Sequence, residues 1–440
     1  METLGYIRNL LDKVNSTFLV SIFSMAKKVI LLWFRNDLRI QDNEILFEAV
    51  DKADIVIPVY FFDPRYFSKN NFDFYNTGIL RSKFLLESVA QLKKSLQELG
   101  ADLLIFQGKP EDHIGTLCAK YDITEVYHHR EVSTRETSIS ESVEAVLWKQ
   151  QINLKHFIGH TLYHKEDLPI PIKDIPDAFS QFKKKVEKES FVRPVLPAVT
   201  QILTHPHLEE TQLPSFLDLG FTAEEVQAME QHSKQLLLGG EEEALKTLAM
   251  TLAVDYDEAD DYNLISPYIA HGCISPAYYY HKIKAAQQGS KKKKKKYDKL
   301  ILRLLWRDYF RFMLKKYPSI FFKDYAQGQS VSESIVAIKN LLQEGSSDEV
   351  IQKLILQVQS QGNLPYEYRE ILASYLLQEL GINHLAGARL FEQLFIDYAP
   401  ASNYGYWLHY ADFGTSLKDN SKLSWTELIK KAYRPKPLAK

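Results

Sequence analysis

Three arginines at four-residue intervals form the most distinctive chemical pattern in the second half of the chain. Arg303, Arg307 and Arg311 stand in a stretch that is otherwise leucine-rich and aromatic. In a helix this spacing places all three on one face, so they make a cationic stripe on an apolar element. Trp306 falls on an adjoining face, and a flat ring beside cations can stack an unpaired base while the cations hold phosphates. A buried tryptophan with arginines that reach into solvent explains the same pattern.

A serine before a proline is the second candidate for chemistry. Ser266 and Pro267 open an apolar helical pattern. A helix that starts in this way exposes free backbone N–H groups and a hydroxyl, which suit a phosphate. An ordinary helix cap uses the same residue types. Further along, Asn403 lies in a Ser-Asn-Tyr-Gly stretch that by itself indicates a turn.

Elements that would position these residues differ between the two halves of the chain. The first half alternates strand-like apolar runs with amphipathic helical segments such as Arg81–Leu99 and Ser138–Lys149. This alternation predicts a doubly wound parallel sheet of Rossmann-like type, which binds ligands beyond the carboxyl ends of its strands. No GxGxxG or GxxxxGK[ST] motif occurs, so the sequence does not support a standard dinucleotide or P-loop site. The expected strands are Val29–Phe34, Ile55–Phe62, Asp102–Gln107, Glu125–His129 and Leu154–Ile158.

The second half is expected to be all helical. Strand signals stop after Gly239 and Gly240, and long helical patterns cover Leu300–Lys315, Tyr366–Leu380 and Leu385–Asp397. A stretch rich in proline and polar residues separates the halves and resembles an ordered linker. The predicted organisation is an N-terminal extension (1–24), an α/β domain (25–160), an inter-domain linker (161–238) and a helical domain (239–440).

Bulk composition sets few limits on function. The 440 residues predict two or three domains with a large core. Aromatic residues make up 12% of the chain, which suits a buried planar ligand and equally suits a large helical core. Because the formal net charge is only −2, any contact with DNA must come from a local basic patch.

Cysteine content and hydropathy favour a cytoplasmic protein without a membrane span. Cys118 and Cys273 cannot by themselves form a disulfide framework or a metal site. No run approaches the roughly 18 apolar residues of a transmembrane helix. The apolar stretch Thr17–Met25 runs almost directly into the first strand, which favours an extended start, with Met25 as a second possible start, over a secretion signal.

Six consecutive lysines, Lys291–Lys296, form the one low-complexity tract. Like charges repel, so the tract is expected to be a solvated loop outside any helix core. It is also a candidate contact for DNA phosphates.

Several blocks, in order along the chain, resemble the photolyase/cryptochrome family. WFRNDLRIQDN (Trp33–Asn43) is similar to the family's N-terminal signature, and Thr161–Pro197 resembles the inter-domain linker of DASH cryptochromes in particular. Leu264–Ile283 is similar to the flavin-phosphate segment, while Leu304–Pro318 and Phe391–Trp407 resemble flavin and substrate motifs. The resemblance implies an N-terminal α/β domain with a doubly wound parallel sheet, followed by an all-α FAD-binding domain.

The resemblance also implies roles for single residues around FAD. Asp397 and Arg369 match a carboxylate–guanidinium pair beside the isoalloxazine, and Asn403 matches the amide that faces the flavin N5 and can donate or accept. Trp407 matches the first member of an electron relay. A structural ion pair and a core tryptophan are the alternatives. The implied cofactor-binding residues are Tyr262, Asn263, Leu264, Ile265, Ser266, Arg307, Arg369, Asp397, Tyr398, Ala399 and Asn403.

A substrate site follows from the same motifs. Trp306, Asn403 and Trp407 are the implied catalytic residues. The implied partner is single-stranded or looped DNA with a pyrimidine dimer, the implied assembly is a monomer, and a folate antenna (5,10-methenyltetrahydrofolate) is a further expected cofactor. The implied DNA-binding residues are Arg303, Trp306, Tyr366, Glu367 and His409.

Several positions depart from the family pattern. Arg303 stands where the family's repair enzymes carry a glutamate, and Tyr366 and Glu367 stand where it has an Asn-Arg pair. His384 replaces the second relay tryptophan, which predicts slow photoreduction of the flavin. His409 replaces an aromatic residue of the lesion pocket. Tyr262 and Asn263 replace a Thr/Ser pair at the phosphate segment.

Three functions are compatible with this pattern. The first is a light-driven lyase that splits cyclobutane pyrimidine dimers with reduced FAD, with weak or absent repair. The second is a flavin photoreceptor without repair activity, favoured by the altered lesion pocket. The third is a protein of the family fold that has lost the flavin, suggested by Tyr262 and Asn263.

Overall fold

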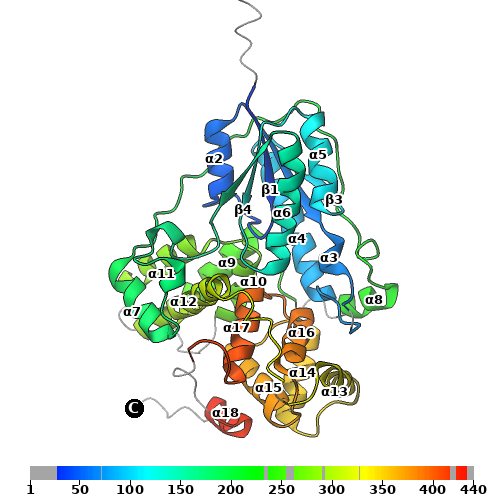
Figure 1. Ribbon diagram of the computed structural model, residues 1–440, viewed down its shortest axis with the longest axis vertical. Helices are drawn as coiled ribbons and strands as arrows, with labels where there is room; N and C mark the ends of the chain where they lie inside the picture. The colour runs from blue at the N-terminus through cyan, green and yellow to red at the C-terminus, as the bar shows by residue number, and fades with distance from the viewer. Residues whose placement is uncertain are drawn as a thin grey trace, which may run out of the picture.

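The computed structural model describes residues 27–70, 72–231, 236–253, 262–289, 293–326, 328–416 and 423–433. Figure 1 shows the strands and their helices in the upper part and the C-terminal helices in the lower part. The expected N-terminal extension, with Thr17–Met25, lies outside the described residues.

Five parallel strands form the sheet, in the order β3-β2-β1-β4-β5. This confirms the predicted doubly wound sheet, in which the strand order reverses between β1 and β4. Two strands differ from the sequence-based expectation: β3 begins later, at Leu104, and β5 begins and ends one residue earlier. The strands are β1 Val29–Phe34, β2 Ile55–Phe62, β3 Leu104–Gln107, β4 Glu125–His129 and β5 Asn153–Phe157.

Helices cover both faces of the sheet, which explains why β1 and β2 are almost continuously apolar. Alternate residues of β1 enter two different cores: Ile30 and Leu32 face one, and Leu31 and Trp33 face the other. Helices α2 (Glu44–Lys52) and α4 (Ile79–Glu98) contribute to the first core, and α5 (Pro110–Lys120) and α6 (Thr134–Lys149) contribute to the second. The short α3 (Pro64–Phe67) follows β2.

The segment between the halves is held to the helical domain by a buried aspartate. Asp308 is fully buried, and its carboxylate accepts hydrogen bonds from the backbone N–H groups of Leu162 (3.0 Å) and Tyr163 (2.9 Å). The segment contains η1 (Lys165–Asp167), η2 (Ile172–Asp174), α7 (Phe179–Glu189) and α8 (Ala223–Gln231). The predicted bounds of the linker remain a prediction.

Helices make up the second half, as predicted. The helix predicted over Leu385–Asp397 is shorter in the structure, because α16 ends at Leu394 and Phe395 is extended. Asp397 therefore lies in the loop that follows α16. The helices are α9 Glu241–Ala253, α10 Tyr262–Ala270, α11 Pro276–Gly289, α12 Lys294–Lys316, α13 Val331–Glu344, α14 Glu349–Gln361, α15 Tyr366–Gln378, α16 His384–Leu394, α17 Pro400–Tyr410 and α18 Trp425–Ala432.

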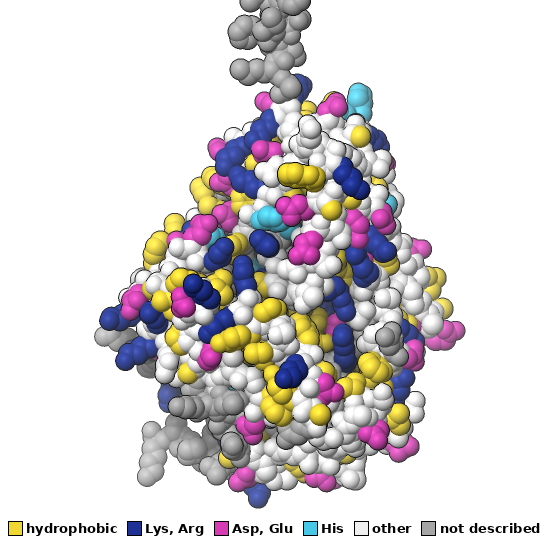
Figure 2. All heavy atoms as spheres, in the orientation of Figure 1, with side chains coloured by type: hydrophobic (Ala, Val, Ile, Leu, Met, Phe, Trp, Pro, Cys, Tyr) yellow, Lys and Arg dark blue, Asp and Glu magenta, His cyan; other side chains and the backbone are white. Residues whose placement is uncertain are grey.

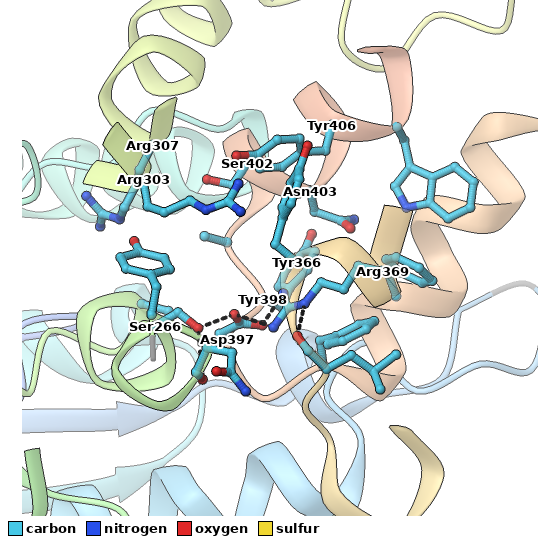
Figure 3. A pocket seen from close by; sticks show the side chains of 18 of the residues that line it. Ser266, Arg303, Arg307, Tyr366, Arg369, Asp397, Tyr398, Ser402, Asn403 and Tyr406 are labelled. Atoms are coloured by element: carbon cyan, nitrogen blue, oxygen red, sulfur yellow. Dashed lines mark hydrogen bonds and ion pairs between the residues drawn. The ribbon is translucent and has the colours of Figure 1, made fainter. Parts of the chain in front are cut away.

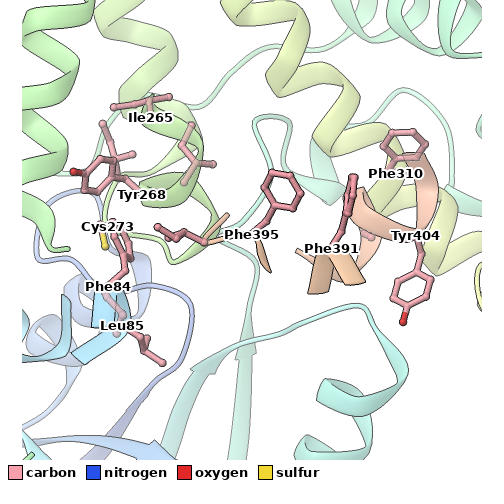
Figure 4. Close-up of a cluster of buried hydrophobic side chains, with 14 of the residues drawn as sticks. Phe84, Leu85, Ile265, Tyr268, Cys273, Phe310, Phe391, Phe395 and Tyr404 are labelled. Carbon is pink, nitrogen blue, oxygen red and sulfur yellow. The ribbon is translucent and has the colours of Figure 1, made fainter. Parts of the chain in front are cut away.

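A continuous apolar core joins the two halves. Figure 4 shows Phe84 and Leu85 of α4 beside Tyr268 and Cys273, and the rings of Phe84 and Tyr268 lie 5.1 Å apart. Gly272 has a φ of +69°, and a Cβ there would collide with the backbone of Asn36. Glycine is therefore required where the turn after α10 meets the loop after β1.

The expectation that the lysine tract is a solvated loop is wrong for its C-terminal part. Lys294–Lys296 form the first turn of α12, and Lys296 is buried. Its ammonium donates to the carbonyl of Thr251 (2.8 Å), and that of Lys293 donates to Ala253 (3.1 Å). Carbonyls in the last described turn of α9 attract cations, so these lysines are held by the protein itself.

Acidic and basic side chains are interspersed on the face seen in Figure 2. This agrees with the near-neutral net charge. Among the described residues, no helix combines the length and the apolar character that a bilayer crossing requires.

Asp308 gives the fold a testable pH dependence. Burial raises the pKa of its carboxyl from 3.8 to about 6. The folded state then binds this proton more tightly than the unfolded state, so the contribution to stability is largest in acid and is lost as the pH rises. Between about pH 4.5 and 7.5 the loss is about 2 kcal/mol.

Asp308→Asn removes this titration. We expect the free energy of unfolding, measured with urea, to decline by ~2 kcal/mol less in D308N than in the wild type over that interval. All other carboxyls titrate in both proteins and cancel in the difference. If the free energies of unfolding of the two proteins changed in parallel with pH, the raised pKa of Asp308 would be contradicted.

Candidate functional site

The main cavity lies inside the helical half. Helices α10, α12, α15, α16 and α17 and the loop after α16 enclose it. Most of its walls are aromatic or cationic (Figure 3). The lining includes twelve of the predicted site residues: Tyr262, Asn263, Ser266, Arg303, Arg307, Tyr366, Arg369, Asp397, Tyr398, Ala399, Asn403 and Trp407.

An ion pair organises one wall of the cavity. Arg369 on α15 donates from Nη1 to Asp397 Oδ1 at 2.9 Å, and its Nη2 lies 2.9 Å from Oδ2 of the same carboxylate. Ser266 donates its hydroxyl to Asp397 Oδ2 at 2.5 Å. Figure 3 shows these three side chains joined along one side, with Arg303 and Arg307 on the other side of the cavity. The structure therefore brings together the predicted carboxylate–guanidinium pair.

Ser266 does not open its helix, contrary to the sequence-based expectation. Helix α10 already includes Tyr262, so Ser266 and Pro267 lie in its interior. A proline inside a helix removes a backbone donor, and here it follows a serine whose hydroxyl points to Asp397. Among the residues of the predicted phosphate segment, Tyr262 and Asn263 are the ones that lie in the first described turn of α10.

Arg307 is buried in the cavity wall opposite the Arg369–Asp397 ion pair. Its guanidinium donates to the backbone carbonyl of His160, in the loop that leaves the sheet domain. Burial lowers the pKa of Arg307 to about 10, and neighbouring Arg311 adds to the effect. Arg311 pairs with buried Glu131 (3.0 Å). Of the predicted cationic stripe, Arg303 and Arg307 therefore line the cavity, whereas Arg311 belongs to the domain interface.

Helix α17 presents Asn403 and Trp407 to the cavity. The turn suggested by the Ser-Asn-Tyr-Gly stretch is wrong, because Pro400–Tyr410 is helical. Asn403 donates from Nδ2 to the carbonyl of Ala388 at 2.9 Å, which fixes the amide. Trp407 is fully buried, and its indole N–H has no hydrogen-bond partner among the described residues.

Two glycines allow α17 to approach its neighbours. A Cβ on Gly387 of α16 would collide with the Trp407 ring, and a Cβ on Gly405 would collide with Phe310 of α12. The packing of Trp407 therefore depends on Gly387 on the facing helix, and the approach of α12 depends on Gly405 on α17 itself.

Aromatic residues and a cation narrow the rim of the cavity. The Arg303 guanidinium lies 3.7 Å from the centre of the Tyr366 ring, and its Nη2 lies 3.8 Å from Glu367. Tyr366 in turn contacts Tyr406, with ring centres 5.4 Å apart. The predicted DNA-binding positions 303, 366 and 367 thus contact one another in this structure.

Trp306 and His409 lie outside the lining of the cavity. The Trp306 ring stacks on Phe179 of α7 at 3.7 Å, with the planes 8° apart, and His409 lies beside it at 5.7 Å. One face of the indole is therefore already covered by the protein's own phenylalanine. His384, at the start of α16, is buried against Tyr325 and Phe413.

Three other predicted residues, Leu264, Ile265 and Glu367, are also absent from the cavity wall. Leu264 is 40% exposed, and Ile265 belongs to the apolar core. Conversely, Tyr406, Tyr410 and Phe395 line the cavity without having been predicted. Tyr406 and Tyr410 stand three and seven residues after Asn403, and this helical spacing was the signal that would have identified them.

A second cavity lies at the carboxyl ends of β1 and β2. Its lining includes Trp33, Arg35, Arg81 and Arg135. Tyr398 lines both cavities, and the Arg81 guanidinium lies 4.6 Å from the centre of its ring. A doubly wound sheet binds ligands beyond the carboxyl ends of its strands.

Two family models match the chain. Residues 30–200 match the family described as DNA photolyase. Residues 300–431 match the FAD binding domain of DNA photolyase, and this range includes most of the main cavity.

Similar proteins cover nearly the whole chain. A cryptochrome DASH of Gloeobacter violaceus is 33% identical over 409 residues, which are 90% of this chain and 81% of that protein. A cryptochrome DASH of Danio rerio is 34% identical over 422 residues, with coverage of 91% and 80%. The crystal structure of a Synechocystis sp. PCC6803 cryptochrome aligns with a TM-score of 0.81 and 31% identity, over 92% of this chain and 86% of that one.

A Rossmann-like sheet joined to a helical FAD-binding domain defines the class of protein, and the chain belongs to the photolyase/cryptochrome family. Within that family, its relatives at 30–34% identity over most of the chain are DASH cryptochromes, the type that the linker sequence predicted.

The residues present in the main cavity fit a flavin. Its aromatic walls suit a planar ring, and Arg307 on one side and Asn263 on the other offer polar groups to a dinucleotide. The buried indole N–H of Trp407 is without a partner among the described residues, which is unusual in a packed interior and is expected beside a ligand site.

Neutralising the aspartate of the ion pair tests the organisation of this wall. In Asp397→Asn the amide keeps the shape but leaves Arg369 without its counter-ion, so we expect the unfolding free energy to fall by about 2 kcal/mol. Chemical unfolding of the purified protein measures this. Lys246→Ala, which removes an exposed pair with Glu243, is the control and should leave the free energy of unfolding essentially unchanged. Equal losses in the two variants would contradict the structural role of the pair.

Proposed function

We propose that this chain binds FAD in the main cavity and responds to blue light as a DASH-type flavoprotein in which repair of pyrimidine dimers is weak or absent. The observation that carries the proposal is the set formed by Arg369, Asp397 and Asn403 around one cavity, with Trp407 beside it. When bound, FAD would supply absorption of blue light and one-electron chemistry.

The chain's own residues would bind and orient the cofactor. Tyr262 and Asn263, with Ser266, would lie along the diphosphate at the start of α10, and Arg307 would add positive charge there. Tyr398 and Ala399 would contact the cofactor from the loop before α17. Arg369 and Asp397 would lie beside the ring system.

Asn403 would meet the reactive nitrogen of the flavin. Its Nδ2 donates one N–H to Ala388, so the side-chain oxygen can accept and the second N–H can donate a hydrogen bond to a ligand. Trp407 is the tryptophan that lines the main cavity. It would serve as the immediate electron donor, and a histidine at position 384 supports slow rather than fast photoreduction.

Closure of the rim supports weak or absent repair. A flipped nucleotide would need the space that Arg303 and Tyr366 occupy at 3.7 Å from each other. It would also need the face of Trp306 that Phe179 covers. The lesion must therefore displace two stacked pairs before it reaches the flavin.

A light-driven lyase acting on cyclobutane pyrimidine dimers in single-stranded or looped DNA is the second candidate. The observation in its favour is the cationic rim, because Arg303 on α12 can attract the phosphates that flank a lesion. In this alternative Trp306 and His409 would contact the flipped bases. Glu367 opposes it, since its negative charge lies at the same rim.

A folate antenna, 5,10-methenyltetrahydrofolate, is a further part of the proposal. The second cavity supports a ligand in the α/β half, because Arg35, Arg81 and Arg135 line it and suit the carboxylates of a folate. Tyr398 would separate that ligand from FAD. We propose that the protein acts as a monomer in the cytoplasm.

The absorption spectrum of the purified protein, before and after blue illumination, tests the flavin proposal. We expect a flavin band, near-stoichiometric uptake of added FAD and slow bleaching by light in the presence of a thiol. With prereduced protein, an oligonucleotide that contains one pyrimidine dimer should show little or no turnover. Multiple turnovers would establish the lyase instead, and a protein that takes up no FAD would leave only the family fold.

A double substitution tests the rim. In R303A/Y366A the stacked pair is removed, so acrylamide, a neutral quencher, should quench the fluorescence of bound flavin several-fold more efficiently than in the wild type. Arg130→Ala, at an exposed arginine outside the cavity lining, is the matched control and should leave quenching unchanged. Equal quenching in all three proteins would show that the rim does not limit access.

A further inference from the structure

Pro267 leaves a gap in the hydrogen bonding of α10. Proline has no backbone N–H, so the carbonyl four residues earlier, that of Asn263, has no helical donor. A buried carbonyl without a donor is costly. In this structure the side-chain amide of Asn363 fills the gap, because its Nδ2 donates to the Asn263 carbonyl at 2.6 Å. The Ser266 hydroxyl lies 3.3 Å from the same oxygen.

The oxygen of the Asn363 side chain contacts the Arg369–Asp397 ion pair. Asn363 Oδ1 accepts a hydrogen bond from Nη2 of Arg369 at 2.9 Å, and the side chain is only 6% exposed. Arg369 in turn binds Asp397, which accepts from Ser266. The hydrogen bonds therefore close a circuit from α10 through Asn363, Arg369 and Asp397 back to α10.

The backbone around Asn363 is fixed from both sides. Gly362 adopts a φ of +66°, and a Cβ there would collide with the Ile396 side chain. The N–H of Ile396 donates to the Gly362 carbonyl at 2.9 Å. Nε of Arg369 donates to the carbonyl of Leu364 at 2.7 Å. The short loop that carries Asn363 is thus held against the loop that carries Asp397.

We propose that Asn363 is a positioning residue of the flavin site. It is absent from the cavity lining and acts through its two partners: it holds the start of α10 and the guanidinium of Arg369 in one arrangement across the cavity. An amide suits this role because it donates and accepts at the same time. The inference rests on the proposed function, since it takes FAD as the ligand of the cavity.

Two substitutions at this position separate its donor from its acceptor. N363A removes both, and we expect the dissociation constant for FAD, measured by titration of the flavin-free protein, to rise about tenfold. N363D keeps the acceptor for Arg369 but, when ionised, has no proton to donate to the Asn263 carbonyl. Its FAD affinity should be low at mildly alkaline pH and should recover in acid, because a protonated carboxyl donates and accepts as the amide does.

The charged groups that face this position are Arg369 from α15 and Asp397 from the loop after α16. Both are present in the wild type, whose FAD affinity is measured over the same pH range as the reference. If FAD affinity recovers in acid only in N363D, the loss at higher pH is therefore due to the missing hydrogen-bond donor to the Asn263 carbonyl. A merely structural role would lower affinity by the same factor at every pH.

Asn383→Ala is the matched control. Asn383 is also a buried asparagine, which caps α16 through Leu385 and donates to Asp324 at 2.9 Å, away from the cavity lining. N383A should lower the thermal unfolding temperature yet leave the FAD dissociation constant within about twofold of the wild type. If N363A binds FAD as tightly as N383A does, the inference is overturned while the proposed function stands. A wild-type protein that binds no FAD overturns the proposed function itself.

Discussion

The ion pair between Arg369 and Asp397 is the interaction on which the helical half depends. Its carboxylate is 8% exposed and its guanidinium 20% exposed, so neither charge is fully solvated and each requires the other. The pair joins α15 to the loop after α16, and Ser266 adds α10 to the same carboxylate. Three segments that are far apart in the sequence therefore meet at one point on the cavity wall.

Close backbone approach supplies the second constraint. Gly272 brings the turn after α10 against the loop after β1, and Gly387 and Gly405 let α16 and α12 close around the helix that carries Trp407. Asp308 adds a carboxylate that holds the linker on α12. These contacts fix the two halves relative to each other, so the main cavity and the second cavity share Tyr398 as a common wall. A ligand in one cavity would thus be separated from the other cavity by a single side chain, that of Tyr398.

At the rim, residues predicted to contact a substrate contact one another. Position 303 carries a cation that lies on an aromatic ring, and position 367 carries a carboxylate beside it. The indole of Trp306 is covered by Phe179. The charged and aromatic residues that would contact a substrate contact one another instead, whereas Arg369, Asp397 and Asn403 keep their places around the cavity.

The sequence by itself determined the local elements and the family. Alternating apolar runs predicted all five strands, because hydrophobic periodicity reports which residues are buried, and motif order predicted the FAD-binding half. Only the tertiary structure decided which residues share the cavity. The position of Ser266 inside α10, the loop conformation of Asp397, and the roles of Asn363 and Lys296 all follow from donors and acceptors supplied by distant segments. Local patterns carry no record of such partners, since a buried carbonyl or carboxylate can be satisfied from any segment that folding brings within hydrogen-bond distance.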